Sequence, residues 1–139
     1  MKTVPNFLRI STMDLKIKLL ELSGGHYLII ITRGLIDARA LEQIFREVAT
    51  TSQALADCKI LIDLADATLI FGPPDIHMLV NGLGPDLLRP DIKIAVVSPA
   101  EIDEFEQLRV LSASLCSLGL KVAVFDNAKG AVIWLGDGS

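Results

Sequence analysis

The feature that most constrains the fold is a short apolar run in the middle of the chain. Ile60, Leu61, Ile62 and Leu64 stand together, interrupted only by Asp63. A near-continuous run of branched aliphatic residues is typical of a strand that is buried on both faces. Such strands belong to sheets that are covered by helices, so the run predicts a layered α/β domain.

The rest of the chain alternates between strand and helix patterns. Alternating or continuous apolar residues predict strands at 15–22, 27–32, 58–64, 92–97 and 120–125. Apolar residues at helical spacing predict helices at 38 to about 55, 73 to about 83, 99–118 and 127–135. The order β-β-α-β-α-β-α-β-α predicts an opening hairpin followed by right-handed crossovers. We therefore expect an α/β fold with a mixed, mostly parallel five-stranded sheet and about four helices.

Capping residues place the helix starts. Asp37 is a good N-cap for the first helix, and Pro73 suits the first turn of the second. Ser98, followed by Pro99 and Glu101, has the pattern of a capping box for the third helix. Asp126 or Asn127 is expected to cap the last one.

Composition limits the classes of partner. The 139 residues include 51% hydrophobic residues but only 5% aromatic ones, and the net charge is −4. An acidic chain argues against a nucleic-acid partner and against electrostatic binding to anionic lipid. No apolar run reaches the ~18 residues that a membrane span needs, and no signal-peptide pattern opens the chain. We expect a cytoplasmic protein with an N-terminal arm over 1–14 and a single domain over 15–139.

Metal, redox and cofactor chemistry has little support in the sequence. Cys58 and Cys116 lack metal-ligand spacing and are predicted to be reduced, buried thiols. His26 and His77 stand apart, so neither a metal nor any other cofactor is expected. An acidic run is predicted to be a solvated helix face: Glu101, Asp103, Glu104 and Glu106.

Three segments carry a resemblance to a known family. They are Gly34-Leu35-Ile36-Asp37, Ile60-Leu61-Ile62-Asp63-Leu64 and Ala131-Val132-Ile133-Trp134-Leu135. In their order and spacing the chain resembles the STAS domain family, the fold of bacterial anti-sigma-factor antagonists, and most of all its SpoIIAA-like branch. The resemblance covers roughly 15–135 and implies a non-enzymatic, regulatory protein-binding module.

One departure from the family bears on regulation. Antagonists of the family carry a phosphorylated serine in an Asp-Ser-Ser-Gly loop after the third strand, whereas this chain reads Phe71-Gly72-Pro73-Pro74. Thr68 aligns just before that position. The resemblance therefore implies a binding module that is not switched by phosphorylation at the usual loop.

The expected partner- or ligand-binding surface combines the first helix start, the loop after the third strand and the second helix. Its residues are Asp37, Asp66, Thr68, Leu69, Phe71, Gly72, Pro73, Asp75 and His77. The expected occupant is a protein partner or a second copy of the chain, most simply in a two-fold homodimer.

Two alternatives stay open. A carrier or sensor of a small apolar ligand, by architectural analogy with CRAL-TRIO lipid-transfer folds, predicts a cavity lined by Leu69, Phe71, Leu87 and Leu88. A hydrolytic or metal-assisted enzyme predicts that Asp63, Asp66, Asp75 and His77 converge in one cleft. Simpler roles are favoured for the aspartates: a hydrogen bond at a strand end for Asp63, a turn for Asp66, and a charge in the first turn of a helix for Asp75.

Overall fold

The predicted order of elements is confirmed. The computed structural model describes residues 14–22, 25–53, 55, 58–87 and 91–136. The strands are β1 (Asp14–Leu22), β2 (Gly25–Asp37), β3 (Cys58–Ile70), β4 (Lys93–Val97) and β5 (Lys121–Phe125). The helices are α1 (Ala38–Ser52), α2 (Pro73–Leu87), α3 (Ile102–Cys116) and α4 (Ala128–Gly136). Asp14, expected in the N-terminal arm, opens β1, and the rest of that arm lies outside the described residues. Within these ranges, no helix combines the length and the apolar character needed to cross a membrane.

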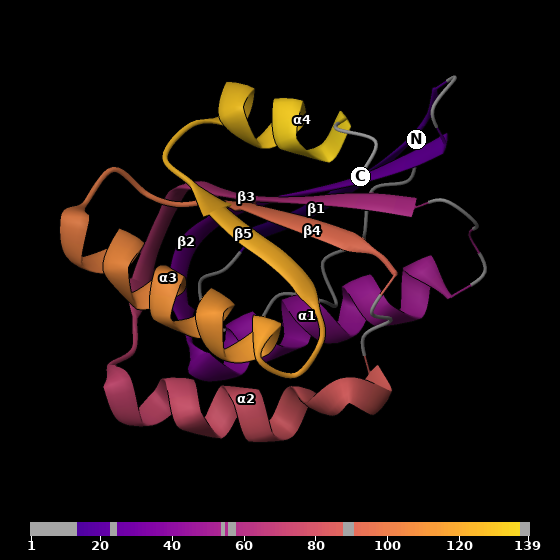
Figure 1. Ribbon diagram of the computed structural model, residues 1–139. Helices are drawn as coiled ribbons and strands as arrows, with labels where there is room; N and C mark the ends of the chain where they lie inside the picture. Colours follow the sequence, from indigo (N-terminus) through magenta and orange to yellow (C-terminus); the bar gives the residue numbers. More distant parts are fainter. Residues whose placement is uncertain (1–13, 23–24, 54, 56–57, 88–90, 137–139) are drawn as a thin grey trace.

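The five strands form one sheet in their sequence order, β1-β2-β3-β4-β5. β1 is antiparallel to β2, and the other three pairs are parallel. Each parallel connection moves the chain one strand in the same direction, so right-handed crossovers place their helices on one face. Figure 1 shows α1 and α3 beneath the sheet, α2 beyond them, and α4 alone on the opposite face.

Each face of the sheet carries its own apolar cluster. The larger one lies between the sheet and the α1–α3 side, with Leu28, Ile30, Phe45, Ile62 and Leu79 among its fully buried members. The smaller one lies under α4 and contains Leu61, Ala95, Val97, Ala131 and Leu135. The β3 strand contributes to both clusters, as its near-continuous apolar run predicts.

β2 and β3 are longer than predicted. The patterns end these strands at 32 and 64, whereas they run on as a parallel pair to Asp37 and Ile70. β4 ends opposite Asp63, so β2 and β3 continue beyond it as a two-stranded extension. The prediction of a loop at 66–74 is therefore wrong as far as Ile70, and again from Pro73, where α2 begins.

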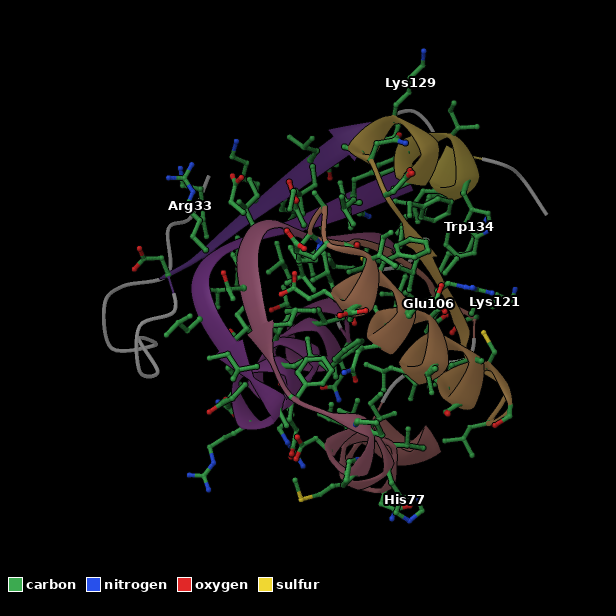
Figure 2. All side chains as sticks on the ribbon, turned by 90° about the vertical axis from the view of Figure 1, so that its left-hand side faces the viewer. Arg33, His77, Glu106, Lys121, Lys129 and Trp134 are labelled. Atoms are coloured by element: carbon green, nitrogen blue, oxygen red, sulfur yellow. The ribbon has the colours of Figure 1, made fainter. Side chains whose placement is uncertain are left out.

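A β-bulge separates this extension from the main sheet. The register shifts so that two steps on β2, from Ile31 to Arg33, match three on β3, from Asp63 to Asp66. The Asp63 carboxylate accepts a hydrogen bond of 2.9 Å from the Ala65 amide. Bulges bend the strand that carries them, and Figure 2 shows the two strands curving together away from the sheet.

Two helix boundaries also differ from the predictions. α2 runs past Gly82 and Gly84 to Leu87, and a Cβ at Gly82 would make only an ordinary contact of 3.5 Å with the Glu42 carboxylate of α1. The predicted capping box at Ser98 is wrong. Its hydroxyl donates to the Pro99 carbonyl, and α3 begins only at Ile102.

The two cysteines lie in different environments. Cys58 is buried, as predicted, but Cys116 is exposed. Cys116 is the last residue of α3, and its thiol donates to the Val122 carbonyl at 3.2 Å. The prediction of a buried thiol at Cys116 is therefore wrong, because this position lies off the buried stripe of the helix.

Candidate functional site

The two-stranded extension turns one face to solvent. Strand alternation buries Ile36 and Ala67 against the core and leaves every second residue outside. Six exposed residues make up what we call the extension face: Arg33, Leu35 and Asp37 on β2, with Asp66, Thr68 and Ile70 on β3. The register sets them in three rows, Arg33 beside Asp66, Leu35 beside Thr68, and Asp37 beside Ile70.

The middle of the extension face is apolar. Leu35 is 45% exposed and Ile70 is 51% exposed, and they are diagonal neighbours on the paired strands. Asp66 and Asp37 flank this pair, and Arg33 marks the end nearest the main sheet, where Figure 2 shows it pointing away from the body. Three predicted site residues, Asp37, Asp66 and Thr68, are thus brought together.

Asp37 also fixes the start of α1. Its carboxylate accepts a hydrogen bond of 2.8 Å from the Ala40 amide, as an N-cap does. The predicted cap is confirmed. This bond ties the end of the extension face to a rigid helix, so the position of the carboxylate is set by backbone geometry.

The first turn of α2 uses its hydrogen-bond donors internally. The Gly72 amide donates to the Asp75 carboxylate at 2.9 Å, and the Asp75 amide donates to the Gly72 carbonyl at 3.0 Å. Pro73 and Pro74 have no amide proton to offer. A helix start usually attracts anions through free amides, but this one offers none in its first turn and already contains a carboxylate.

Leu69 and Phe71 face inward. Both are partly buried and pack against the larger apolar cluster. The Leu69 amide donates to Glu104 Oε2 at 2.6 Å, so the first turn of α3 holds the edge of β3 that β4 leaves uncovered. Sequence reasoning missed this role of Glu104, because the acidic run around it has the pattern of a solvated helix face.

The residues of the enzyme alternative have separate surroundings. Asp63 and Asp75 accept bonds from their own local backbone, and Asp66 lies on the extension face. His77 is exposed and points outward from α2 in Figure 2. In the part of the chain that the structure describes, no group of three or more His, Cys, Asp or Glu side chains could hold a metal ion.

The apolar cavity in the core is small. It lies among Leu41, Phe45, Ile62, Leu108 and their neighbours and measures about 10 Å³. A single water needs roughly 10–15 Å³, and a ligand pocket needs roughly 300 Å³ or more. Of the predicted carrier cavity, Leu88 lies outside the described residues and the side chain of Leu87 is not described.

Among the described strands, the sheet has no topological switch point. Ligands of open α/β sheets bind where the strand order reverses, because the two flanking crossovers there diverge to opposite faces. Here the order runs from β1 to β5 without reversal. The carboxyl-terminal parts of β2 and β3 form the extension face.

This strand order and helix arrangement define a SpoIIAA-like α/β fold, and solved structures bear out the predicted resemblance at the level of fold. An uncharacterized protein of the DUF3478 family from Shewanella loihica PV-4, itself described as SpoIIAA-like, is 14% identical, with 91% of this chain and 98% of that chain covered and a TM-score of 0.53. An anti-sigma factor antagonist from Mycobacterium paratuberculosis is 16% identical, with 98% of this chain and 100% of that chain covered and a TM-score of 0.50. No protein-family model and no curated protein matches the sequence.

Proposed function

We propose that this protein is a non-enzymatic, cytoplasmic regulatory module that binds a protein partner through the extension face. The observation that carries the proposal is the exposed pair Leu35 and Ile70 on rigid, paired strands. Exposed apolar side chains gathered on one face are typical of interaction sites. α2, which follows β3 after two residues, carries exposed side chains of its own, Met78, which is 59% exposed, and His77.

The chemistry of the face defines the partner that would fit. An apolar centre between two carboxylates, Asp37 and Asp66, calls for a small apolar patch flanked by lysine or arginine. The single cation, Arg33, stands at the end of the face and favours one orientation of the partner. A protein partner also accords with the structural neighbour that is an anti-sigma factor antagonist.

We also propose that partner binding at this surface is not switched by phosphorylation at the start of α2. No hydroxyl stands there, and Asp75 already accepts from the Gly72 amide, so a phosphate would meet a carboxylate in place of free donors. Like charge and occupied donors both oppose a phosphate at this position.

The test compares two pairs of aspartate substitutions. Leu35→Asp with Ile70→Asp places charge in the centre of the face, and Ile102→Asp with Val110→Asp makes the same change on α3, where these residues are 77% and 53% exposed. Affinity capture from a lysate of the source organism is followed by mass spectrometry and by reconstitution with the purified partner. We expect one protein to bind the unchanged chain and the α3 control, and not the L35D/I70D protein.

Self-association is examined with the same proteins. Light scattering across a concentration series gives the mass of the particle in solution. If a homodimer forms through this face, only the L35D/I70D protein should have the mass of a monomer. Equal binding and equal mass for all three proteins would refute the extension face as the interaction site.

A further inference from the structure

Three lysines stand side by side at the other end of the sheet. The register pairs Tyr27 with Lys59, Lys59 with Lys93, and Lys93 with Lys121, at the amino-terminal ends of β3, β4 and β5. Residues paired in this way share one face of the sheet, here the face under α4. Neighbouring strands lie about 4.8 Å apart, so the three lysines span about 10 Å. We call Lys59, Lys93 and Lys121 the lysine row.

Aromatic rings and the end of α4 hold this row in place. The Lys93 ammonium donates to the Trp134 carbonyl at 2.5 Å and lies 4.3 Å from the centre of the Trp134 ring. The Lys59 ammonium lies 5.3 Å from the centre of the Tyr27 ring. Cations are favoured at a helix C-terminus and over aromatic faces, so the middle of the row is a fixed positive charge. In Figure 2, Lys121 and Trp134 both lie on the side away from Arg33.

Placing like charges side by side on neighbouring strands opposes folding. Among the described residues, no ion pair joins Lys59 or Lys121 to a carboxylate. Lys121 is exposed and Lys59 is half-buried, so their ammonium groups retain donors for a ligand. Lys59 and Lys121 thus bring two ammonium groups to the ends of a row about 10 Å long, in a protein with a net charge of −4.

We propose that the lysine row is a binding site for a small polyanion whose charged oxygens span about 10 Å, either an oligophosphate or a tricarboxylate. Lys59 and Lys121 hold the anion from the two ends of the row, and Lys93, fixed between them by Trp134, sets their spacing. Lysine binds phosphate and carboxylate as a point charge. The row lies at the opposite ends of the strands from the extension face, so the site is separate from the proposed protein-binding surface.

The experiment measures anion binding by the full chain. Isothermal titration with tripolyphosphate, and separately with citrate, is done at constant ionic strength, because exposed charges are screened by salt. The test protein is Lys59→Gln with Lys121→Gln. The control is Lys16→Gln with Lys129→Gln, which removes the same charge from two exposed lysines outside the row.

We expect at least one of the two anions to bind, with about tenfold or greater weakening in K59Q/K121Q and less than about threefold in the control. Whichever anion binds more tightly identifies the class of the ligand. Without anion, K59Q/K121Q should melt at a higher temperature than the unchanged chain, because like-charge repulsion is relieved. The rise in melting temperature that the anion causes should disappear in this variant.

Two results would overturn the proposal. Equal weakening in both double variants would mean that the anion responds to overall charge and not to the row. Binding of neither anion by the unchanged chain would make the lysines ordinary surface residues, whatever the melting temperature of K59Q/K121Q.

Discussion

Glu104 gives the sharpest test of what holds the extension in place. Its carboxylate accepts the Leu69 amide proton at 2.6 Å, across 35 positions of sequence, on the edge of β3 that has no strand beside it. Glu104→Ala removes the acceptor and leaves a partly buried amide without a protein partner. Glu104→Gln keeps a carbonyl oxygen at the same reach but removes the charge.

The expected loss follows from the geometry of this bond. A hydrogen bond to a charged group contributes about 1.5–3 kcal/mol. Leu69 is only partly buried, so water can replace part of the interaction, and we expect Glu104→Ala to lower the free energy of unfolding by about 1–2 kcal/mol. For a chain of 139 residues this corresponds to a fall in melting temperature of about 3–8 °C. Glu104→Gln should lose about half as much.

Urea unfolding followed by circular dichroism measures this change, and hydrogen exchange at the Leu69 amide locates it. The matched control is Glu106→Ala on the same helix, where the carboxylate pairs with Arg109 at 3.1 Å on the exposed surface. Exposed pairs contribute little, so the control should lose less than about 0.5 kcal/mol. If Glu104→Ala lost no more than Glu106→Ala, and Leu69 exchanged at its original rate, the proposed anchoring of β3 would be refuted.

Three further changes test other parts of the fold. Asp37→Ala should cost about 1 kcal/mol in urea unfolding, and Asp37→Asn much less, because asparagine also caps helices; equal losses would contradict the capping bond to Ala40. Gly34 has a φ of 92°, so Gly34→Ala should cost about 1–2 kcal/mol in thermal unfolding, and an unchanged melting temperature would contradict this backbone conformation. Ile62 is fully buried, so Ile62→Ala should cost about 2–5 kcal/mol by calorimetry, and a loss below about 1 kcal/mol would mean that the core closes around the gap.

The element order could be predicted because each element carries its own local signal. The run at 60–64, the helical spacing from Leu41 to Val48 and the N-cap at Asp37 each depend on a few neighbouring residues. The ends of β2 and β3 could not be predicted in this way. Gly34, Asp66 and Ala67 have low strand propensity, and they lie in strands because Gly34 pairs with Ala67 and Arg33 pairs with Asp66.

The candidate surface could be predicted only in part for the same reason. The sequence predicts Asp37, Asp66 and Thr68 on one surface, and the register brings them together. The sequence does not reveal that Leu35 and Ile70 are exposed, because apolar residues in a strand are more often inside. Nor does it reveal that Glu104 reaches Leu69, since that contact depends on where α3 packs.

The sequential strand order has a consequence for how the chain assembles during synthesis. Every strand pairs with the strand that precedes it, so the sheet can grow one strand at a time as the chain leaves the ribosome. α4 departs from this order, because it returns across β5 and β4 to β3. A nascent chain that has emerged as far as Phe125 already contains the whole sheet, yet Leu61, Ala95 and Val97 remain bare until α4 follows.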